Sequence, residues 1–148
     1  MCLCAMEPET RGSSHFSARQ PRFRVPSVPY CMLAILLVKL ALKAVGFGRT
    51  LGWIRQRVEG VPLVEDVGVE LARGVERSVA IAGALYPGRA LCLEQSLVLY
   101  YVLRKGGVAA EFHIGAQAHP FLAHAWVQHR GEPINDVAEH VRRFAPLF

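Results

Sequence analysis

The chain has 148 residues, of which 52% are hydrophobic and 20% charged, with a formal net charge of +5. This length is enough for one domain with a buried core and too short for two. Basic residues do not alternate with aromatic ones as on base-stacking surfaces, which argues against nucleic-acid binding. Of the four cysteines, Cys2 and Cys4 have no matching pair downstream, so we predict neither a zinc ribbon nor a disulfide framework. A reducing cytoplasm is the expected compartment.

The first 29 residues contain Gly, Ser, Pro, Arg and Glu without a sustained hydrophobic period. A segment of this composition does not bury enough apolar surface to offset the entropy lost on ordering. We predict that residues 1–29 form a disordered basic extension and that residues 30–148 form the single domain.

The apolar stretch at residues 31–45 predicts the first helix. Its uninterrupted apolar run from Cys31 to Val38 has eight residues, well short of the roughly 20 that span a bilayer. Lys39 and Lys43 then form a polar stripe, and no cleavage site of small residues marks a mature start. We expect this helix to be buried in the domain, with peripheral membrane contact as the alternative.

Two more helices are predicted before the middle of the chain. Thr50 can cap a short helix that runs through Val58, and the acidic pair Glu65-Asp66 favours the first turn of a longer one. The longer helix repeats apolar residues at a period of about 3.6 and stops near Leu85. Each helix should therefore turn one face toward a core.

A central helix is predicted between Pro87-Gly88, which break the preceding helix, and Gly106-Gly107, which supply a C-terminal cap. It is apolar on almost every side, which is typical of a helix in the middle of a domain. Cys92 lies in its first turn, where the helix dipole favours a thiolate over a thiol. The alternative is that Cys92 only packs, because free cysteine is among the most buried residue types.

Three short antiparallel strands are predicted at residues 109–117, 122–128 and 132–136, where Phe, Ile, Val and Trp are frequent. Residues 137–144 are expected to form one last helical turn. Helices followed by strands indicate an α+β domain, in which the cysteine-bearing helix packs on a C-terminal antiparallel sheet.

The last two strands predict a pairing of two polar residues. Residues 129–131 fit a three-residue hairpin loop, with Gly131 in the left-handed position. That register places His124 opposite Asp136, with Cβ atoms about 5 Å apart. A carboxylate at this separation can orient the imidazole and stabilise its charged form, which leaves the second ring nitrogen to take a proton from a thiol.

Cys92, His124 and Asp136 are the parts of a cysteine peptidase or a transglutaminase-type acyl transferase. Trp126 should share a face with His124, where it could wall the site or belong to the core. The structural alternatives are that His124 is an ordinary strand histidine and that Asp136 serves turn chemistry. The other histidines lack the spacing of metal ligands, so we expect no metal.

These residues resemble a known family, the transglutaminase-like leader peptidases of lasso-peptide biosynthesis. The resemblance rests on Cys92-Leu93-Glu94-Gln95-Ser96, Leu103, Gly107, Ile114-Gly115, His124-Ala125-Trp126-Val127, Gly131 and Asn135-Asp136. It covers about residues 31–148 and is strongest from Arg89 onward. It implies a papain- or transglutaminase-like fold and removal of the leader from a ribosomally made precursor. We expect the standalone form, without the leader-recognition domain that some members carry.

The same resemblance implies that Cys92 is the nucleophile, that His124 is the general base and then acid, and that Asp136 orients it. It implies no metal or organic cofactor. The implied partners are the precursor peptide, a separate leader-recognition protein and an ATP-dependent macrolactam cyclase. Two other functions stay open, namely transglutaminase or amidase activity and a non-catalytic scaffold for the cyclase.

Overall fold

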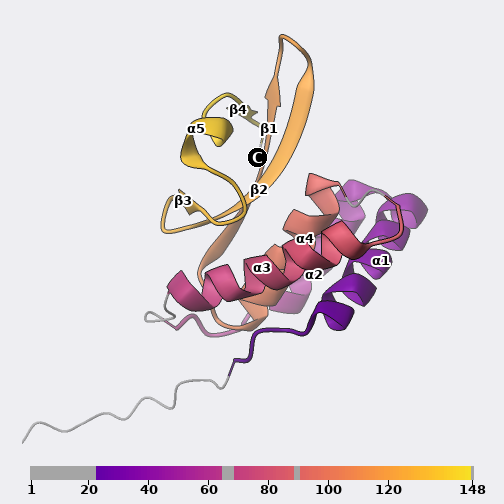
Figure 1. Ribbon diagram of the computed structural model, residues 1–148, viewed down its shortest axis with the longest axis vertical. Coiled ribbons are helices and arrows are strands. Elements are labelled where there is room, and N and C mark those ends of the chain that lie inside the picture. The colour runs from indigo at the N-terminus through magenta and orange to yellow at the C-terminus, as the bar shows by residue number, and fades with distance from the viewer. Residues whose placement is uncertain (1–22, 65–68, 89–90, 148) are drawn as a thin grey trace, which may run out of the picture.

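A computed structural model describes residues 23–64, 69–88 and 91–147. In these residues four helices precede a small antiparallel sheet, and a one-turn helix lies among the last strands (Figure 1). The helices are α1 (Val28–Val45), α2 (Phe47–Val58), α3 (Val69–Leu85), α4 (Cys92–Lys105) and α5 (Ala138–Val141). The strands are β1 (Ala110–Gln117), β2 (Leu122–His129), β3 (Glu132–Pro133) and β4 (Ala145–Pro146). The predicted α+β class is confirmed.

The packed part of the chain includes residues before the boundary predicted at Tyr30. Helix α1 begins at Val28, with a proline in its first turn. Phe23 packs against the main hydrophobic core, although it belongs to the segment predicted to be a disordered extension. Residues 1–22 of that segment lie outside the described residues.

The prediction that the first helix is buried is wrong. Cys31 and Ile35 are fully buried, whereas Leu33, Leu37 and Leu40 are 54%, 57% and 54% exposed. Within the described residues, α1 is the one helix long and apolar enough to cross a membrane by length and composition, and 11% of it is buried. The helix contacts α2, α3 and α4, and the described chain places no element over its outer leucines.

Helix α2 starts at Phe47, three residues before the predicted cap at Thr50. Gly46 has a φ of 82°, which lets the chain turn from α1 directly into α2. The Thr50 hydroxyl instead donates to the Gly46 carbonyl at 2.8 Å, inside the first turn. In α3 the apolar stripe is confirmed by its buried residues, Val75, Val79 and Ala82. The acidic pair predicted at the start of α3, Glu65-Asp66, lies outside the described residues.

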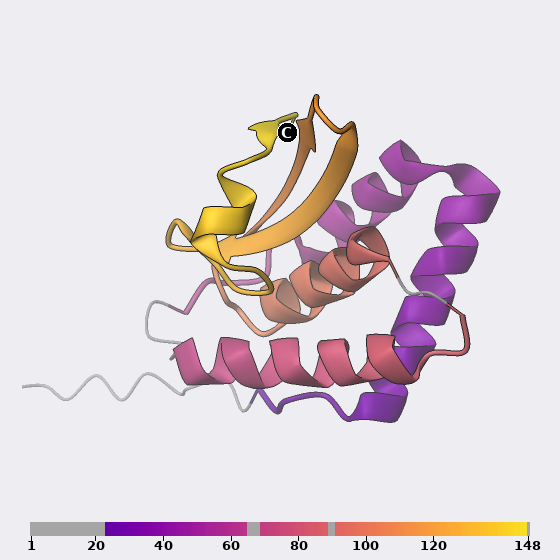
Figure 2. The same ribbon diagram turned by 45° about the horizontal axis from the view of Figure 1, so that its top comes forward.

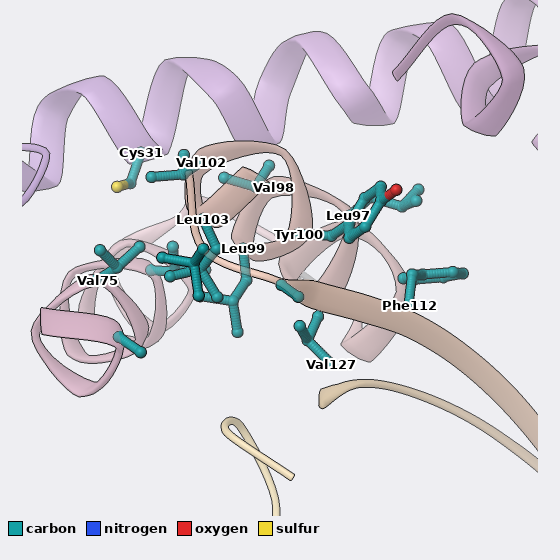
Figure 3. Close-up of a cluster of buried hydrophobic side chains, with 14 of the residues drawn as sticks. Cys31, Val75, Leu97, Val98, Leu99, Tyr100, Val102, Leu103, Phe112 and Val127 are labelled. Atoms are coloured by element: carbon teal, nitrogen blue, oxygen red, sulfur yellow. The ribbon is translucent and has the colours of Figure 1, made fainter. Parts of the chain in front are cut away.

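Helix α4 is the centre of the domain, as predicted. It contacts α1, α2 and α3 on one side and β1 and β2 on the other (Figure 2). Its side chains at Leu97, Leu99 and Leu103 are at most 1% exposed. Val98 and Val102 face α1, while Phe112 and Val127 close the same cluster from the strands (Figure 3).

The double glycine ends α4 as the sequence predicts. The N–H groups of Gly107 and Val108 donate to the carbonyls of Arg104 and Leu103, at 3.1 and 3.0 Å. This pairing satisfies two of the carbonyls that a helix end leaves free, and it requires the left-handed φ of 80° found at Gly107. A Cβ there would also stand 3.0 Å from the Pro62 carbonyl oxygen.

The sheet has the strand order β3-β2-β1-β4 and is antiparallel throughout. Side chains alternate along β2, so that Ala125 and Val127 join the main core with the helices. Trp126 points to the opposite face and packs with Val141 and Phe144. Helix α4 therefore covers one face of the sheet, with α1–α3 packed around it, and the segment around α5 covers the other face.

The predicted three-residue loop between β2 and β3 is wrong. The loop has two residues, Arg130 and Gly131, both with positive φ (52° and 81°), and His129 pairs with Glu132. Two residues of this conformation form the tight turn that matches strand twist. A ladder continued in this register would put Asp136 opposite Ala125 and on the wrong face for His124. Strand β3 ends at Pro133, however, and after one more backbone hydrogen bond, from the Ile134 N–H to the Val127 carbonyl, the chain bends over residues 134–136.

Candidate active site

The structure brings two of the three predicted site residues into direct contact. His124 Nε2 lies 2.5 Å from Asp136 Oδ2. The side chains are 17% and 13% exposed, so the pair is largely screened from water yet not sealed. The bend after β3, rather than the predicted strand register, carries Asp136 to this position. Because the ionised carboxylate only accepts, His124 donates through Nε2–H and leaves Nδ1 free for proton transfer.

Asp136 is held by donors on both carboxylate oxygens. Oδ2 also lies 2.7 Å from His140 Nδ1, and Oδ1 accepts a 2.7 Å hydrogen bond from the Val137 N–H. Burial raises the pKa of Asp136, but the hydrogen bonds from His140, the Val137 N–H and His124 outweigh it and hold that pKa below its ordinary value. Asp136 is therefore an anion throughout the neutral range.

His140 was not predicted to belong to the site. It lies on α5, four residues after Asp136, and its side chain is 43% exposed. The i, i+4 spacing of an aspartate and a histidine at a helix start was the available signal. Ligand atoms of His124, Asp136 and His140 all lie within 4.8 Å of one another. This set could hold a divalent metal ion such as zinc, which the spacing of the histidines in the sequence did not predict.

Ser96 joins the cysteine helix to the strands that carry the histidine and the carboxylate. Its fully buried hydroxyl donates to the Ala125 carbonyl at 2.9 Å and accepts from Asn135 Nδ2 at 2.9 Å. Asn135 Oδ1 in turn accepts from the Val127 N–H at 2.8 Å. The Asn135 side chain thus takes the place of a strand carbonyl and satisfies a β2 amide beyond the end of β3. Sequence reasoning assigned no role to Ser96 or Asn135, because the hydrogen bond between them joins residues 39 positions apart and Ser96 reaches Ala125 across 29.

Cys92 lies one helical turn before Ser96, on the same side of α4, which corresponds to about 6 Å along the axis. Leu103, near the other end, accepts from the N–H of Val108, just before β1. The end of α4 thus lies near His129, which pairs with the start of β1, and Ser96 lies beside Ala125. The first turn of α4 is therefore at the end of β2 that carries His124. Cys92 is half-buried, unlike the fully buried Cys31. Within the described residues no direct hydrogen bond joins Cys92 to His124, and Ser96 links their elements.

Aromatic rings enclose His124 on the face opposite the helices. Trp126 stacks on it with centroids 6.0 Å apart and planes inclined by 15°, and the Phe144 ring lies at 5.2 Å. Trp126 is 4% exposed, so it both shares the face of His124 and belongs to a small core. Gly115, which pairs with His124, has no room for a side chain, since a Cβ would stand 2.7 Å from Phe144 Cβ.

Thiol-dependent acyl transfer uses a cysteine, a histidine and an orienting carboxylate. Among the described residues the structure joins His124 to Asp136 directly, and it places the half-buried Cys92 at the start of the central helix without a hydrogen bond to either. A family model for the transglutaminase-like superfamily matches residues 34–148. The chain therefore belongs to the transglutaminase-like superfamily, which includes cysteine peptidases and acyl transferases. Searches of curated proteins and of solved structures found no match.

Proposed function

We propose that the protein is a cysteine peptidase that cleaves the leader from a ribosomally synthesised lasso-peptide precursor. The observation that carries the peptidase chemistry is the contact between His124 and Asp136 on strands tied by Ser96 to the cysteine helix. The substrate class rests on the resemblance of the blocks around Cys92, His124 and Asp136. Cleavage precedes macrolactam closure by a separate cyclase, because the ring forms through the amine that cleavage releases.

In the first half of the reaction, His124 Nδ1 takes the thiol proton and the Cys92 sulfur bonds to the carbonyl carbon at the leader–core junction. The carbonyl electrons move to oxygen and give a tetrahedral oxyanion. The Cys92 N–H, which as a first-turn amide has no helical partner, is a donor for this oxyanion. When the C–N bond breaks, the imidazolium gives its proton to the departing amine, and the leader stays on sulfur as a thioester.

In the second half, water replaces the amine. His124 Nδ1 takes a proton from the water as its oxygen bonds to the thioester carbon. The C–S bond then breaks, the leader leaves with a free carboxylate, and the thiol regains its proton from the imidazolium. Asp136 does not exchange a proton. It keeps the ring oriented through Nε2–H and stabilises the imidazolium present in both halves.

The proposed setting is cytoplasmic, with a small leader-recognition protein that delivers the precursor and an ATP-dependent cyclase that takes the released core. No metal or organic cofactor enters either half-reaction, because the thiol and the imidazole carry every bond change. A nucleic acid has no place in this scheme.

The deciding experiment incubates the full chain with the precursor and the recognition protein encoded beside it, and follows peptide masses. We expect the wild-type protein to release leader and core, Cys92→Ala to leave the precursor intact, and Cys31→Ala to cleave normally once its fold is verified by circular dichroism. Cleavage by the Cys92→Ala variant would contradict the mechanism.

The same assay separates the two alternatives. With a primary amine added in excess, a transglutaminase or amidase-type acyl transferase yields a leader whose mass carries the amine, whereas a peptidase yields the free acid. A scaffold without activity yields neither product, and Cys92→Ala then supports cyclisation as well as the wild-type protein does.

A further inference from the structure

Helix α1 and helix α2 together form an exposed apolar surface on this protein. Leu33, Leu37 and Leu40 follow one another at the spacing of one helical side and are each more than half exposed. An open groove of about 640 Å³ separates this side of α1 from α2. Leu33, Leu37, Ala41, Ile54 and Tyr101 contribute apolar walls, and Trp53 is 53% exposed at the groove. We call this surface the α1–α2 face.

The charged residues within α1 and α2 all have one sign. Helices α1 and α2 carry Lys39, Lys43, Arg49, Arg55 and Arg57 and no aspartate or glutamate, and the exposed Glu59 follows α2 directly. Lys43, Arg49, Arg55 and Arg57 are exposed on the two helices. In the part of the chain that the structure describes, none of these four forms an ion pair. An occupant of the α1–α2 face must therefore combine apolar groups with negative charge.

We propose that the α1–α2 face docks on an anionic phospholipid bilayer. A helix pair with leucines on its outer side, a tryptophan at the edge of the groove and basic residues around it has the composition of surfaces that lie in the membrane interface. The leucines enter the boundary between headgroups and acyl chains, and the lysine and arginine side chains reach anionic headgroups. We favour lipid over an acidic protein because exposed leucines, an exposed tryptophan and basic residues that form no ion pair among the described residues occur together.

The docked helix lies on the bilayer and does not span it. Cys31 and Ile35 of α1 are completely buried against the rest of the domain, so insertion across the membrane would pull two core residues out. Lys39 also contacts the Tyr86 ring, with its Nζ 5.2 Å from the centroid. In Figures 1 and 2, α1 and α5 lie on opposite sides of α4. Docking through α1 therefore leaves the His124–Asp136 side open to a peptide.

Vesicle co-sedimentation of the full chain tests this proposal. One set of vesicles is phosphatidylcholine alone, and the other contains about one third phosphatidylglycerol. We expect at least a tenfold stronger association with the anionic vesicles, roughly as the surface charge of a few basic residues requires. Raising the salt about fivefold should weaken that association by about an order of magnitude. Equal binding to both vesicle types, or no binding, would overturn the proposal.

Three variants localise the contact. Leu33→Glu/Leu37→Glu should lose at least about tenfold in vesicle affinity, and Arg49→Gln/Arg57→Gln about tenfold, because each removes one of the two attractions. Leu63→Glu is the matched control, since Leu63 is 53% exposed on the segment after α2 and does not line the groove. It should bind like the wild-type protein. Thermal melting checks that each variant is folded. If Leu33→Glu/Leu37→Glu does not fold, Arg49→Gln/Arg57→Gln still tests the proposal.

Two results would assign the face differently. If both α1–α2 variants bind vesicles as tightly as the wild-type protein does, the face is not the membrane contact. If vesicles do not bind but an acidic partner protein does, and Leu33→Glu/Leu37→Glu abolishes that binding, the occupant is a protein and the lipid proposal is wrong. Cleavage of a soluble precursor should be unchanged in both variants, which keeps this test separate from that of the peptidase.

Discussion

Asn135 donates a 2.9 Å hydrogen bond to Ser96. This bond links the neighbour of Asp136 to α4, the helix that begins at Cys92. Ser96 completes the link by donating to the carbonyl next to His124. Apolar side chains of the main core also pack between α4 and the strands, and such contacts permit sliding. This buried polar connection fixes their relative position one turn from Cys92.

Ser96→Ala should therefore lower kcat for precursor cleavage by at least about tenfold while KM changes little, because the nucleophile and the base lose their relative placement. The free energy of unfolding should fall by about 1–3 kcal/mol, since Asn135 Nδ2 is left without its buried acceptor. Steady-state kinetics and urea unfolding check both values. Ser78→Ala, on α3, is the control and should change neither. Normal kcat in folded Ser96→Ala would show that the connection is only structural.

Asp136→Asn should slow alkylation of Cys92 by iodoacetamide about tenfold at neutral pH. Without the carboxylate the imidazolium is less stable, so the thiolate form of Cys92 is less populated. Residue-resolved mass spectrometry measures the rate, and the fully buried Cys31 in the same molecules serves as the reference. An unchanged Cys92 rate would mean that His124 and Asp136 do not act on this thiol.

The acid dependence of stability should carry the signature of Asp136. Its pKa is lowered in the folded state from 3.8, so the folded protein binds fewer protons at this group than the unfolded chain does. The stabilisation is thus complete above the unfolded value and is lost as the pH falls through the lowered folded value. Urea unfolding of the wild-type protein and Asp136→Asn should show a constant difference near neutrality that shrinks only below about pH 4. If the stability difference between the wild-type protein and Asp136→Asn vanished near neutral pH, the effect would belong to another titrating group.

His140 acts on the same carboxylate from α5. Among the groups that lower the pKa of Asp136, its hydrogen bond ranks first. In His140→Ala the acid loss of stability should therefore begin at higher pH than in the wild-type protein, and kcat should fall only a few-fold because His124 keeps its partner. His119→Ala, an exposed histidine in the loop between β1 and β2, should leave the pH profile unchanged.

Zinc should inhibit the protein reversibly. His124, Asp136 and His140 present ligand atoms close enough together for one ion, and a bound ion would occupy the imidazole that has to exchange protons. Inhibition of precursor cleavage should be relieved by a chelator and should require at least about tenfold more zinc in His140→Ala. Equal sensitivity of His140→Ala and the wild-type protein would exclude this site.

The local elements of the fold were predictable because their signals are local. A double glycine after a basic pair ends α4 through hydrogen bonds within one turn, and apolar periodicity identifies the core side of α3. The His124–Asp136 contact was also predicted, although from a register that is wrong by one residue. That register depends on whether Arg130 adopts a positive φ, which its side chain disfavours and only the surrounding hairpin enforces.

The order of Cys92, His124 and Asp136 and the helices-then-strands pattern were thus determined by the sequence alone. Tertiary structure decided the contacts that act at a distance, namely Ser96 with Asn135 and His140 with the shared carboxylate. It also decided that α1 is exposed, because hydrophobicity states which residues avoid water but not which of them the remaining chain can cover. The main core surrounds α4, and the described part of this 148-residue chain leaves the outer leucines of α1 uncovered.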